Sequence, residues 1–418
     1  MLIKMQVGEQ DRGELQVNVT DSDNAPIRDA RVTISEPETA INPNSPIERL
    51  ETDVSGQTQI VDLNTPPLEY SLNENNENMP YANYNIQIEA PGYETENISN
   101  VEILPDSLSL QDVRMRRREG EQVENIDIDP HTLYAEHPEK IPEDEIKDVN
   151  EPGEIVLSRV VIPEYVVVHN GTPSSNARDY YVTYKDYIKN VASSEIYATW
   201  PRATIEANVL AIMSFTLNRV YTEWYRNKGY DFTITSSTAY DQKWIYGRNI
   251  FQSISDVVEE MFQNYLSRPN VRQPILTQYC DGQRVTCSNW LSQWGSKYLG
   301  DQNYETIEIL RYYYGDNMFI NTAEEISGIP ASWPRYNLEV GAAGDKVRQI
   351  QEQLARISQA YPAIPTITPD GIYGEATKAA VEKFQSIFGL PVTGVVDYRT
   401  WYKISEIYVA VTRIAELV

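Results

Sequence analysis

The stretch VASSEIYATWP, residues 191–201, decides how this chain folds, together with the positions just before it. Tyr184, Ile188 and Val191 lead to Glu195 in steps of four, three and four residues, which is the spacing of one helix face. This spacing places a carboxylic acid where a buried hydrophobe is expected. Burial raises the pKa of a carboxyl group, and a carboxyl that stays protonated near neutral pH can act as a general acid. Alternatively, Glu195 marks the end of the helix and points to solvent.

The run that follows is predicted to be a central, buried helix. Pro201 suits the first turn of a helix, where its missing N–H costs nothing. From Ala203 to Tyr221 apolar residues cover nearly every face, and a helix that is apolar all round is a buried one. The sequence therefore predicts Glu195 at the mouth of a buried helix.

Several short motifs in these two segments resemble the signature of the stage II sporulation protein D family. They are SEIY at 194–197, ANVLA at 207–211 and SFT at 214–216. Members of that family are lytic transglycosylases that cut the glycan strands of peptidoglycan. The resemblance places the catalytic acid of the family on Glu195. The chain departs from the family's pattern at Asn208, which replaces the usual Gln, and at Met213, which replaces the usual Arg.

A second block also resembles this family. It comprises LSQWG at 291–295 and NYETIEILRYYYG at 303–315, and FTITSSTAYDQ at 232–242 resembles the strand that lines the family's glycan groove. The resemblance implies substrate-binding side chains, which we predict to be Asn208, Tyr240, Gln242, Ser292 and Gln293. Hydroxyl and amide groups suit sugar hydroxyls, although an ordinary exposed strand would have the same composition. Two histidine-containing elements of the family are missing, so we predict a shortened catalytic domain with no metal site and no cofactor.

Composition limits the classes of protein to consider. A chain of 418 residues with 41% hydrophobic residues can bury two or three cores, and no apolar run is long enough to span a bilayer. A net charge of −26 argues against nucleic acid as a partner. Residues 1–157 hold 34 acids and 11 bases, whereas residues 158–418 hold 27 acids and 24 bases. The acidic residues are concentrated at the front of the chain, which we expect to form a separate part of the protein.

This acidic front begins with a predicted β-sandwich. Leu15, Val17 and Val19 alternate with polar residues, and the same alternation recurs twice before residue 90, which indicates half-buried strands. With the turn TDVSGQ at 52–57, the pattern resembles the carboxypeptidase regulatory-like sandwich. We assign residues 1–118 to this module and expect a structural or regulatory role, because it contains no catalytic constellation.

Residues 119–157 are predicted to be an acidic linker. They are rich in Glu, Asp and Pro and lack an apolar period, and such a composition cannot bury enough surface to fold alone. A basic run at 114–118 precedes them, and it is either a solvated strand end or a protease target.

Further elements are predicted on either side of the Glu195 motif: a strand over 160–168, a helix over 254–265 and a hairpin over 275–287 that turns at Asp281-Gly282. In a two-residue turn, Cys280 and Cys287 lie too far apart for a disulfide, so a bridge is expected only if the turn is irregular. His169 follows the strand and is a candidate base, with a structural role as the alternative.

The tail of the chain closely resembles the peptidoglycan-binding domain 1 family, a small three-helix bundle. The turn DGIYG at 370–374 and the pair Phe384-Gln385 carry the resemblance. Val347, Ile350 and Leu354 form one predicted helix stripe, so most of the motif belongs to the core. We assign residues 329–418 to this domain.

Taken in order, these parts resemble the spore cortex-lytic enzymes of clostridia, the SleC type. The predicted fold is multidomain α+β, with an N-terminal β-sandwich, a central mixed α+β catalytic domain over 158–328 and a C-terminal three-helix bundle. The resemblance implies a zymogen that acts on cortex peptidoglycan and is activated by a germination protease. We place the cut between Leu157 and Ser158. The N-terminus lacks a recognisable signal peptide, which fits deposition into the cortex and coat region from the mother cell.

Two other classes of function stay open. A non-enzymatic wall-binding or amidase-enhancing protein would use the Glu195 domain only to position glycan. A glycoside hydrolase usually needs a second carboxylate, for which Asp241 is the better candidate and Glu206 the weaker one. Only a transglycosylase cleaves the bond between N-acetylmuramic acid and N-acetylglucosamine to leave 1,6-anhydro-muramic acid ends.

Overall fold

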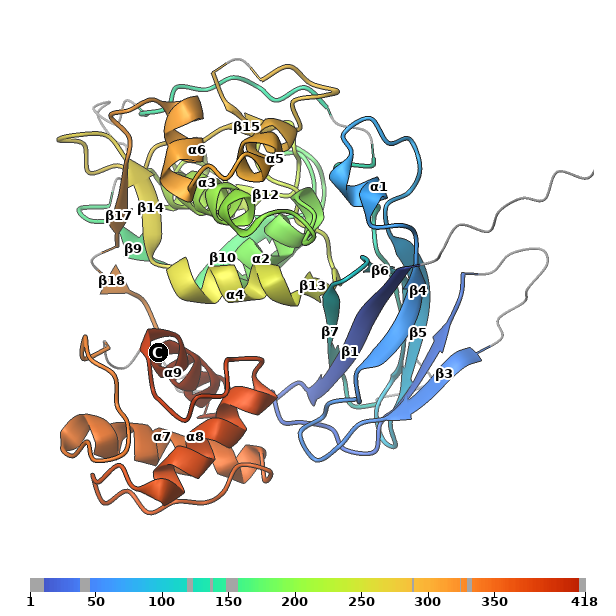
Figure 1. The fold of residues 1–418 in the computed structure, drawn as a ribbon, viewed down its shortest axis with the longest axis vertical. Coiled ribbons are helices and arrows are strands. Elements are labelled where there is room, and N and C mark those ends of the chain that lie inside the picture. The colour runs from blue at the N-terminus through green and yellow to red at the C-terminus, as the bar shows by residue number, and fades with distance from the viewer. Residues whose placement is uncertain are drawn as a thin grey trace, which may run out of the picture.

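The computed structural model describes residues 11–37, 46–118, 123–135, 138–147, 157–287, 289–323, 325–328 and 333–412. Within these ranges the chain is mixed α+β, with several separate sheets and with its longer helices after residue 183. Figure 1 shows the early strands on one side, a group of helices beside them, and the last three helices in the lower part of the view. None of the described helices is long and apolar enough to cross a membrane.

Two sheets form a sandwich from the front of the chain. One has strand order β13-β7-β1-β4 and the other β3-β2-β5-β6-β8. The strands that residues 11–127 contribute to the two sheets are β1 (Asp11–Asp21), β2 (Arg31–Ser35), β3 (Pro46–Glu51), β4 (Val61–Thr65), β5 (Ala82–Glu89), β6 (Thr95–Ile103), β7 (Leu108–Met115) and β8 (Val123–Asp127). The short helix α1 (Glu69–Leu72) precedes β5. Leu15, Val17 and Val19 of β1 are fully buried in the core between the sheets, so the predicted alternation of this strand is confirmed.

The sandwich shares its sheets with later parts of the chain. β13 (Ile250–Phe251) extends one sheet by pairing antiparallel with β7, as Figure 1 shows. β8 pairs parallel with β6, although it lies where the composition predicts a linker. The linker prediction for 119–157 is therefore wrong for residues 123–135 and 138–147. Their own composition is poor in apolar groups, but the sandwich and the central helices supply the partners.

The central helices pack around α3 (Arg202–Tyr221). α2 (Tyr184–Glu195) ends at Glu195, and α3 begins directly after Pro201, as the sequence predicts. α3 is buried on nearly every face, and α2, α4 (Gln252–Met261), α5 (Gln293–Asp301) and α6 (Thr306–Tyr314) pack against it. The core that results holds the carboxyl end of α2 in a fixed place.

Short strands surround these helices. They are β9 (Val161–Ile162), β10 (Tyr165–His169), β11 (Asp179–Thr183), β12 (Ile234–Thr235), β14 (Asn264–Ser267), β15 (Tyr279–Cys280), β16 (Leu291–Ser292), β17 (Phe319–Thr322) and β18 (Glu325–Ile326), with the 3₁₀ turn η1 (Arg226–Lys228) after α3. The strand predicted over 160–168 is split into β9 and β10. The helix predicted over 254–265 ends at Met261, because Tyr265 pairs with β17. The strand predicted over 232–242 shrinks to β12, which pairs with β10.

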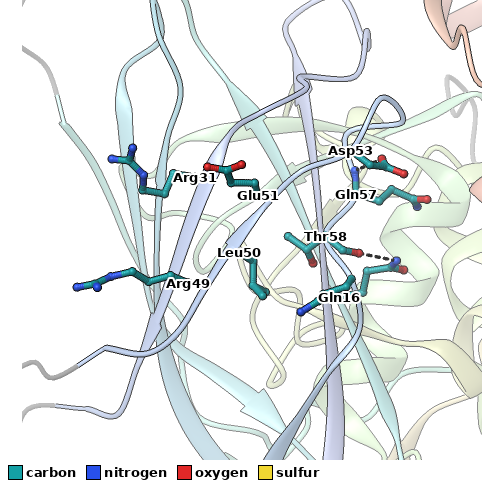
Figure 2. A pocket seen from close by; sticks show the side chains of 9 residues that line it. Gln16, Arg31, Arg49, Leu50, Glu51, Asp53, Gln57 and Thr58 are labelled. Atoms are coloured by element: carbon teal, nitrogen blue, oxygen red, sulfur yellow. Dashed lines mark hydrogen bonds between the residues drawn. The ribbon is translucent and has the colours of Figure 1, made fainter.

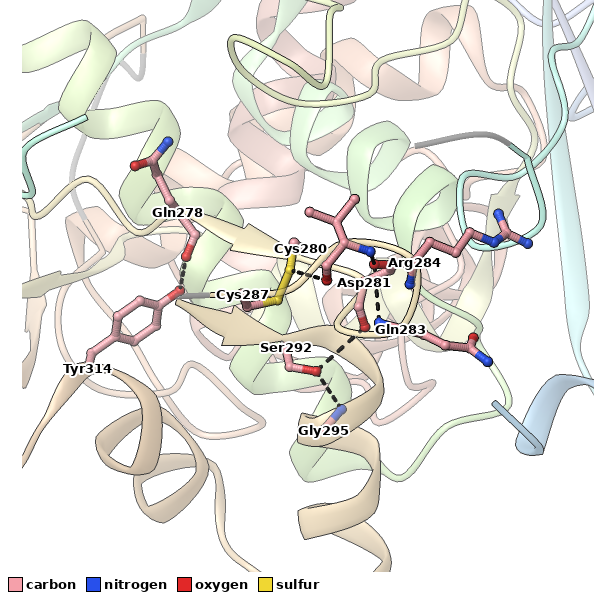
Figure 3. Close-up of a disulfide and its surroundings, with 10 residues drawn as sticks. Gln278, Cys280, Asp281, Gln283, Arg284, Cys287, Ser292, Gly295 and Tyr314 are labelled. Carbon is pink, nitrogen blue, oxygen red and sulfur yellow. Dashed lines mark hydrogen bonds between the residues drawn. A yellow bond between two sulfur atoms is a disulfide. The ribbon is translucent and has the colours of Figure 1, made fainter. Parts of the chain in front are cut away.

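The predicted hairpin over 275–287 is replaced by a disulfide loop, shown in Figure 3. β15 pairs parallel with β16, and Cys280 is bonded to Cys287 with their Cα atoms 5.7 Å apart. The two-residue turn that would keep the sulfurs apart is therefore absent, and the irregular turn that allows a bridge is the alternative that holds. The carboxylate of Asp281 accepts hydrogen bonds from the backbone N–H groups of residues 283–285 and so closes a wider loop.

The last three helices form a bundle of α7 (Asp345–Ala360), α8 (Glu375–Ile387) and α9 (Tyr398–Thr412). Val347, Ile350 and Leu354 are buried, as their spacing predicts. The side-chain oxygen of Gln385 accepts from the backbone N–H groups of Thr393 and Gly394, both at 2.9 Å. The Phe-Gln motif therefore belongs to the core, where the amide of Gln385 holds the loop that leads to α9.

Buried ion pairs hold the bundle against the central helices. Glu259 of α4 accepts from Lys185 and Lys189 of α2, at 2.8 and 2.7 Å. Lys403 of α9 lies 3.7 Å from Glu259, and Glu406 of α9 pairs with both Lys185 and Lys403. The cluster thus joins three helices from two regions of the sequence.

Candidate active site around Glu195

Glu195 is the last residue of α2 and is buried, with 1% of its surface exposed. Its Oε1 accepts a hydrogen bond of 2.7 Å from the backbone N–H of Lys243. Its Oε2 has no hydrogen-bond partner among the described residues. The hydroxyl of Tyr279 lies beside the carboxyl group but makes no hydrogen bond of good geometry with it. One oxygen is therefore fixed by the backbone, and the other is buried without a partner.

Burial raises the pKa of Glu195 above its ordinary value. The positive charge of Lys140 opposes this effect first, followed by the hydrogen bond from Lys243 and by Tyr279. Because burial outweighs these contributions, the carboxyl group is biased toward its protonated form. The alternative that Glu195 points to solvent is ruled out by its burial.

Lys140 comes from the acidic stretch and enters the interior beside Glu195. Its Nζ donates to the backbone carbonyl of Asp241 at 2.8 Å and lies 4.3 Å from the centre of the Tyr279 ring. Burial lowers the pKa of Lys140, whereas the charges of Glu195 and then Asp241 raise it. The composition of residues 119–157 did not predict this contact.

Asp241 is fully buried and fully hydrogen-bonded. Its Oδ1 accepts from Nε of Arg219 at 2.8 Å. Its Oδ2 accepts from the hydroxyl of Tyr225 at 2.6 Å, and from the backbone N–H and hydroxyl of Thr235 at 2.9 and 2.7 Å. A fully buried carboxylate with four donors, at least one on each oxygen, is a structural hub, and this does not suit the second carboxylate of a hydrolase.

Glu206, the weaker candidate for a second carboxylate, lies on α3 and is engaged near the surface. It accepts from Nε of Arg202 at 2.8 Å and from the hydroxyl of Thr306 at 2.6 Å. Both of its carboxylate oxygens therefore have protein partners.

Two of the predicted sugar contacts are interior groups. The amide of Asn208 donates to the carbonyl of Thr204 and to the hydroxyl of Ser296, at 2.9 and 2.8 Å. The side-chain oxygen of Gln242 accepts from the hydroxyls of Tyr187 and Thr216 at 3.0 and 2.9 Å. Both side chains are buried and bound to protein, so this arrangement corrects the prediction that they face a sugar: they join helices and loops.

The remaining predicted contacts lie at different depths. Ser292 caps α5 by accepting from the N–H of Gly295, as Figure 3 shows. Gln293 is buried, and its side-chain oxygen has no partner among the described residues. Tyr240 is exposed, directly before Asp241. The structure thus leaves Tyr240 as the predicted contact that already faces solvent.

His169, the candidate base, is part of a braced loop. Its Nδ1 lies 2.7 Å from Oδ1 of Asp179, and its Nε2 lies 3.1 Å from the carbonyl of Ser175. The ring stacks on Phe232 with the ring centres 4.7 Å apart. These contacts support the structural alternative for His169.

Residues 129–132 hold two neighbours of Glu195, Ser194 and Lys243, a role that the composition of this segment did not predict. The backbone N–H and the hydroxyl of Thr132 both donate to the carbonyl of Ser194. Asp129 pairs with Nζ of Lys243 at 2.7 Å. Lys140 and Lys147 are the basic residues within 119–157, and their presence in so acidic a run was the signal available.

A cavity of about 740 Å³ lies elsewhere, on the sandwich. Figure 2 shows its lining, which includes Arg31, Arg49, Glu51 and Asp53. The two arginine side chains extend away from Asp53 in this view. The cavity contains no buried carboxyl group or histidine, so size alone does not identify it as the reactive site.

Comparison with known proteins bears mainly on the bundle. A family model for a peptidoglycan binding domain matches residues 343–404. A curated relative, the zinc D-Ala-D-Ala carboxypeptidase of Streptomyces albus G, is 39% identical over 71 residues, which are 17% of this chain and 26% of that protein. The chain therefore spans about a quarter of the length of this relative. These matches support a peptidoglycan-binding domain in a cell-wall protein, with peptidoglycan as a partner.

Solved structures resemble single parts of the chain. The SleB N-terminal domain is 28% identical, with 18% of this chain and 99% of that chain covered and a TM-score of 0.16. The minor pilin GBS52 of Streptococcus agalactiae is 17% identical, with 27% and 48% covered and a TM-score of 0.19.

Proposed function

We propose that this protein is a lytic transglycosylase that degrades spore cortex peptidoglycan during germination, with Glu195 as its acid and base. The observation that carries the proposal is a buried carboxyl group with raised pKa, one oxygen held by a backbone N–H and the other without a partner. The family resemblance of the motif around Glu195 supports the same assignment. Residues 158–328 would carry the chemistry and residues 329–418 the attachment to the wall.

The proposed reaction needs a single carboxyl group. Glu195 gives its proton to the glycosidic oxygen as the bond to C1 of the muramic residue breaks. The carboxylate then takes the proton from the C6 hydroxyl of that residue while the C6 oxygen bonds to C1. The products are a free sugar hydroxyl and a 1,6-anhydro end, and Glu195 regains its proton. The full engagement of Asp241 favours this reaction over a hydrolase with two carboxylates.

We further propose that the chain is a zymogen, cut between Leu157 and Ser158 by a germination protease. The backbone N–H of Leu157 donates to the carbonyl of Tyr221 at 3.0 Å, and the bond borders a cavity of about 410 Å³. N-terminal sequencing of the form present in germinating spores tests the cut. An active form that keeps residues 1–157 contradicts it.

The first prediction is that Glu195→Gln abolishes lysis. A positioned general acid and base contributes roughly 10²–10⁴-fold, so the lytic rate should fall by that order while binding to the wall is kept. For this assay, a recognition sequence for a specific protease is placed at residues 151–154. Lysis is measured after that protease has cut the chain there. The matched control is Glu206→Gln, which should have a mild effect because Glu206 pairs with Arg202 and Thr306.

The chemistry of the ends decides between the classes. Anhydro-muramic ends support the transglycosylase, and reducing muramic or glucosamine ends would support a hydrolase. If the cut chain binds cortex and forms no ends, the protein is a binding protein and Glu195 only positions glycan.

A further inference from the structure

A ten-residue segment of the acidic stretch lies against the central helices and is held there by backbone hydrogen bonds at two points. We call residues 138–147 the strap. The backbone N–H of Ile141 donates to the carbonyl of Ala239 at 2.9 Å, and the carbonyl of Glu145 accepts from the N–H of Leu276 at 2.8 Å. Together with the entry of Lys140 beside Glu195, these bonds place the strap across the candidate site.

Two glutamines of the central region bind the strap through its backbone amides. Gln278 donates to the carbonyl of Ile141 at 2.8 Å and accepts from the N–H of Glu143 at 2.9 Å. Gln273 donates to the carbonyl of Lys147 at 3.2 Å and accepts from the N–H of the same residue at 2.7 Å. Each side-chain amide thus offers one donor and one acceptor to peptide amide groups.

Aromatic rings lie beside the two strap lysines. Nζ of Lys140 is 4.3 Å from the centre of the Tyr279 ring, and Nζ of Lys147 is 4.4 Å from that of Trp224. Amide side chains beside aromatic faces also suit sugars, which present hydroxyl groups at their edges and C–H groups on their faces. A 2-acetamido group is itself a secondary amide, with the same donor and acceptor as the backbone that the glutamines now hold.

We propose that the strap occupies the glycan-binding groove of the Glu195 site in place of substrate. In this proposal Gln278 and Gln273 receive the acetamido groups of N-acetylated sugars when the strap leaves. Lys140 fills the position beside Glu195. The inference rests on the proposed function and adds to it the groove, the sugar class and the residue that blocks the site.

The strap is anchored by charge as well as by backbone bonds. Both carboxylate oxygens of Glu143 accept from the buried guanidinium of Arg219, at 2.6 and 3.0 Å. Arg219 keeps Asp241 as a partner when Glu143 is removed. Loosening the strap therefore leaves the buried arginine paired, so the variants below are expected to fold.

The test measures binding of N,N′,N″,N‴-tetraacetylchitotetraose to the intact chain by titration calorimetry. The double variant Lys140→Met/Glu143→Gln removes the charge contacts of these two strap residues and leaves the pair of Glu145 with Arg268 in place. Because hydrogen bonds to charged groups are among the stronger ones, their loss should open the groove more often, and the affinity should rise by about tenfold or more. The matched control Glu139→Gln changes an exposed strap residue, and the affinity should stay at the wild-type value.

A second pair of variants tests the glutamine assignment. Adding Gln278→Ala to the double variant should return the affinity to about the wild-type value, a tenfold change being 1.4 kcal/mol. Adding Gln283→Ala, which changes an exposed residue of the disulfide loop, should have no effect. A synthetic peptide with the sequence of residues 138–147 should compete with the oligosaccharide for the double variant, and less well when its Lys140 is replaced by Met.

The outcomes separate this inference from the proposed function. If hydrogen exchange shows the strap released and the double variant binds the oligosaccharide no better than wild type, the groove assignment is overturned. Retention of the gain in the presence of Gln278→Ala overturns it as well. If the double variant binds the oligosaccharide more tightly but does not lyse cortex after it has been cut as in the lysis assay, the groove is supported and the transglycosylase is contradicted. If the cut double variant lyses cortex without a gain in binding, the groove is contradicted and the transglycosylase is supported.

Discussion

The ion pair between Glu143 and Arg219 predicts how strongly the strap is held. Glu143 accepts from two nitrogens of Arg219 and, at 2.5 Å, from Nζ of Lys147. The Arg219 side chain is fully buried, and that of Glu143 is 14% exposed. Burial alone raises the pKa of Glu143, but the hydrogen bonds and charge of Arg219, and then those of Lys147, lower it from 4.5 to about 2.

The size of the effect follows from this pKa. A shift from 4.5 to about 2 corresponds to about 3 kcal/mol in favour of the ionised carboxylate in the folded chain. Because the pKa is lowered on folding, this contribution is complete above pH 4.5 and is lost as the pH falls toward about 2. Glu143→Gln should therefore weaken the attachment of the strap by about 3 kcal/mol at pH 7.

Hydrogen exchange measures how much the Glu143→Gln variant weakens the attachment of the strap. Amides of residues 138–147 should exchange on the order of a hundredfold faster in Glu143→Gln than in wild type at pH 7, after correction for intrinsic rates. The difference between the two chains should shrink as the pH is lowered below 4.5. Glu139→Gln is the control and should leave the exchange of the strap unchanged. Equal exchange of Glu143→Gln and wild type at pH 7, or a difference that persists at pH 2, would refute the reasoning.

Two other perturbations have defined outcomes. Glu259→Gln leaves Lys185, Lys189 and Lys403 beside one another without their shared carboxylate, and removal of one partner from a buried ion cluster costs about 3–5 kcal/mol. The bundle should separate from the central helices, seen as faster exchange in α9, and unchanged exchange there contradicts the docking role of this cluster. Replacing Cys280 and Cys287 together by Ser removes a constraint worth about 2 kcal/mol. Thermal unfolding should begin at a lower temperature in the double Ser variant, and an unchanged transition would show that hydrogen bonds alone hold the loop.

The sequence by itself determined the elements with a strong local pattern. The steps of four, three and four residues that end at Glu195 predicted α2 and the burial of its last carboxyl group, and Pro201 with the apolar run predicted α3. The bundle was predicted from the family resemblance of the motifs at 370–374 and 384–385, and the spacing of Val347, Ile350 and Leu354 predicted one of its helix faces. Helix periods, caps and breakers act between residues a few positions apart, so a single sequence contains them.

The tertiary structure alone decided which distant segments meet. β13 joins a sheet whose nearest strand, β7, lies about 140 positions earlier in the chain, and β15 pairs with β16 where a hairpin was expected. Lys140 reaches Glu195 from a stretch whose composition predicted a linker, and Asn208 and Gln242 turn inward. The physical reason is that polar and acidic residues become buried only when other segments supply their hydrogen bonds and charges, and such partners leave no local period in the sequence.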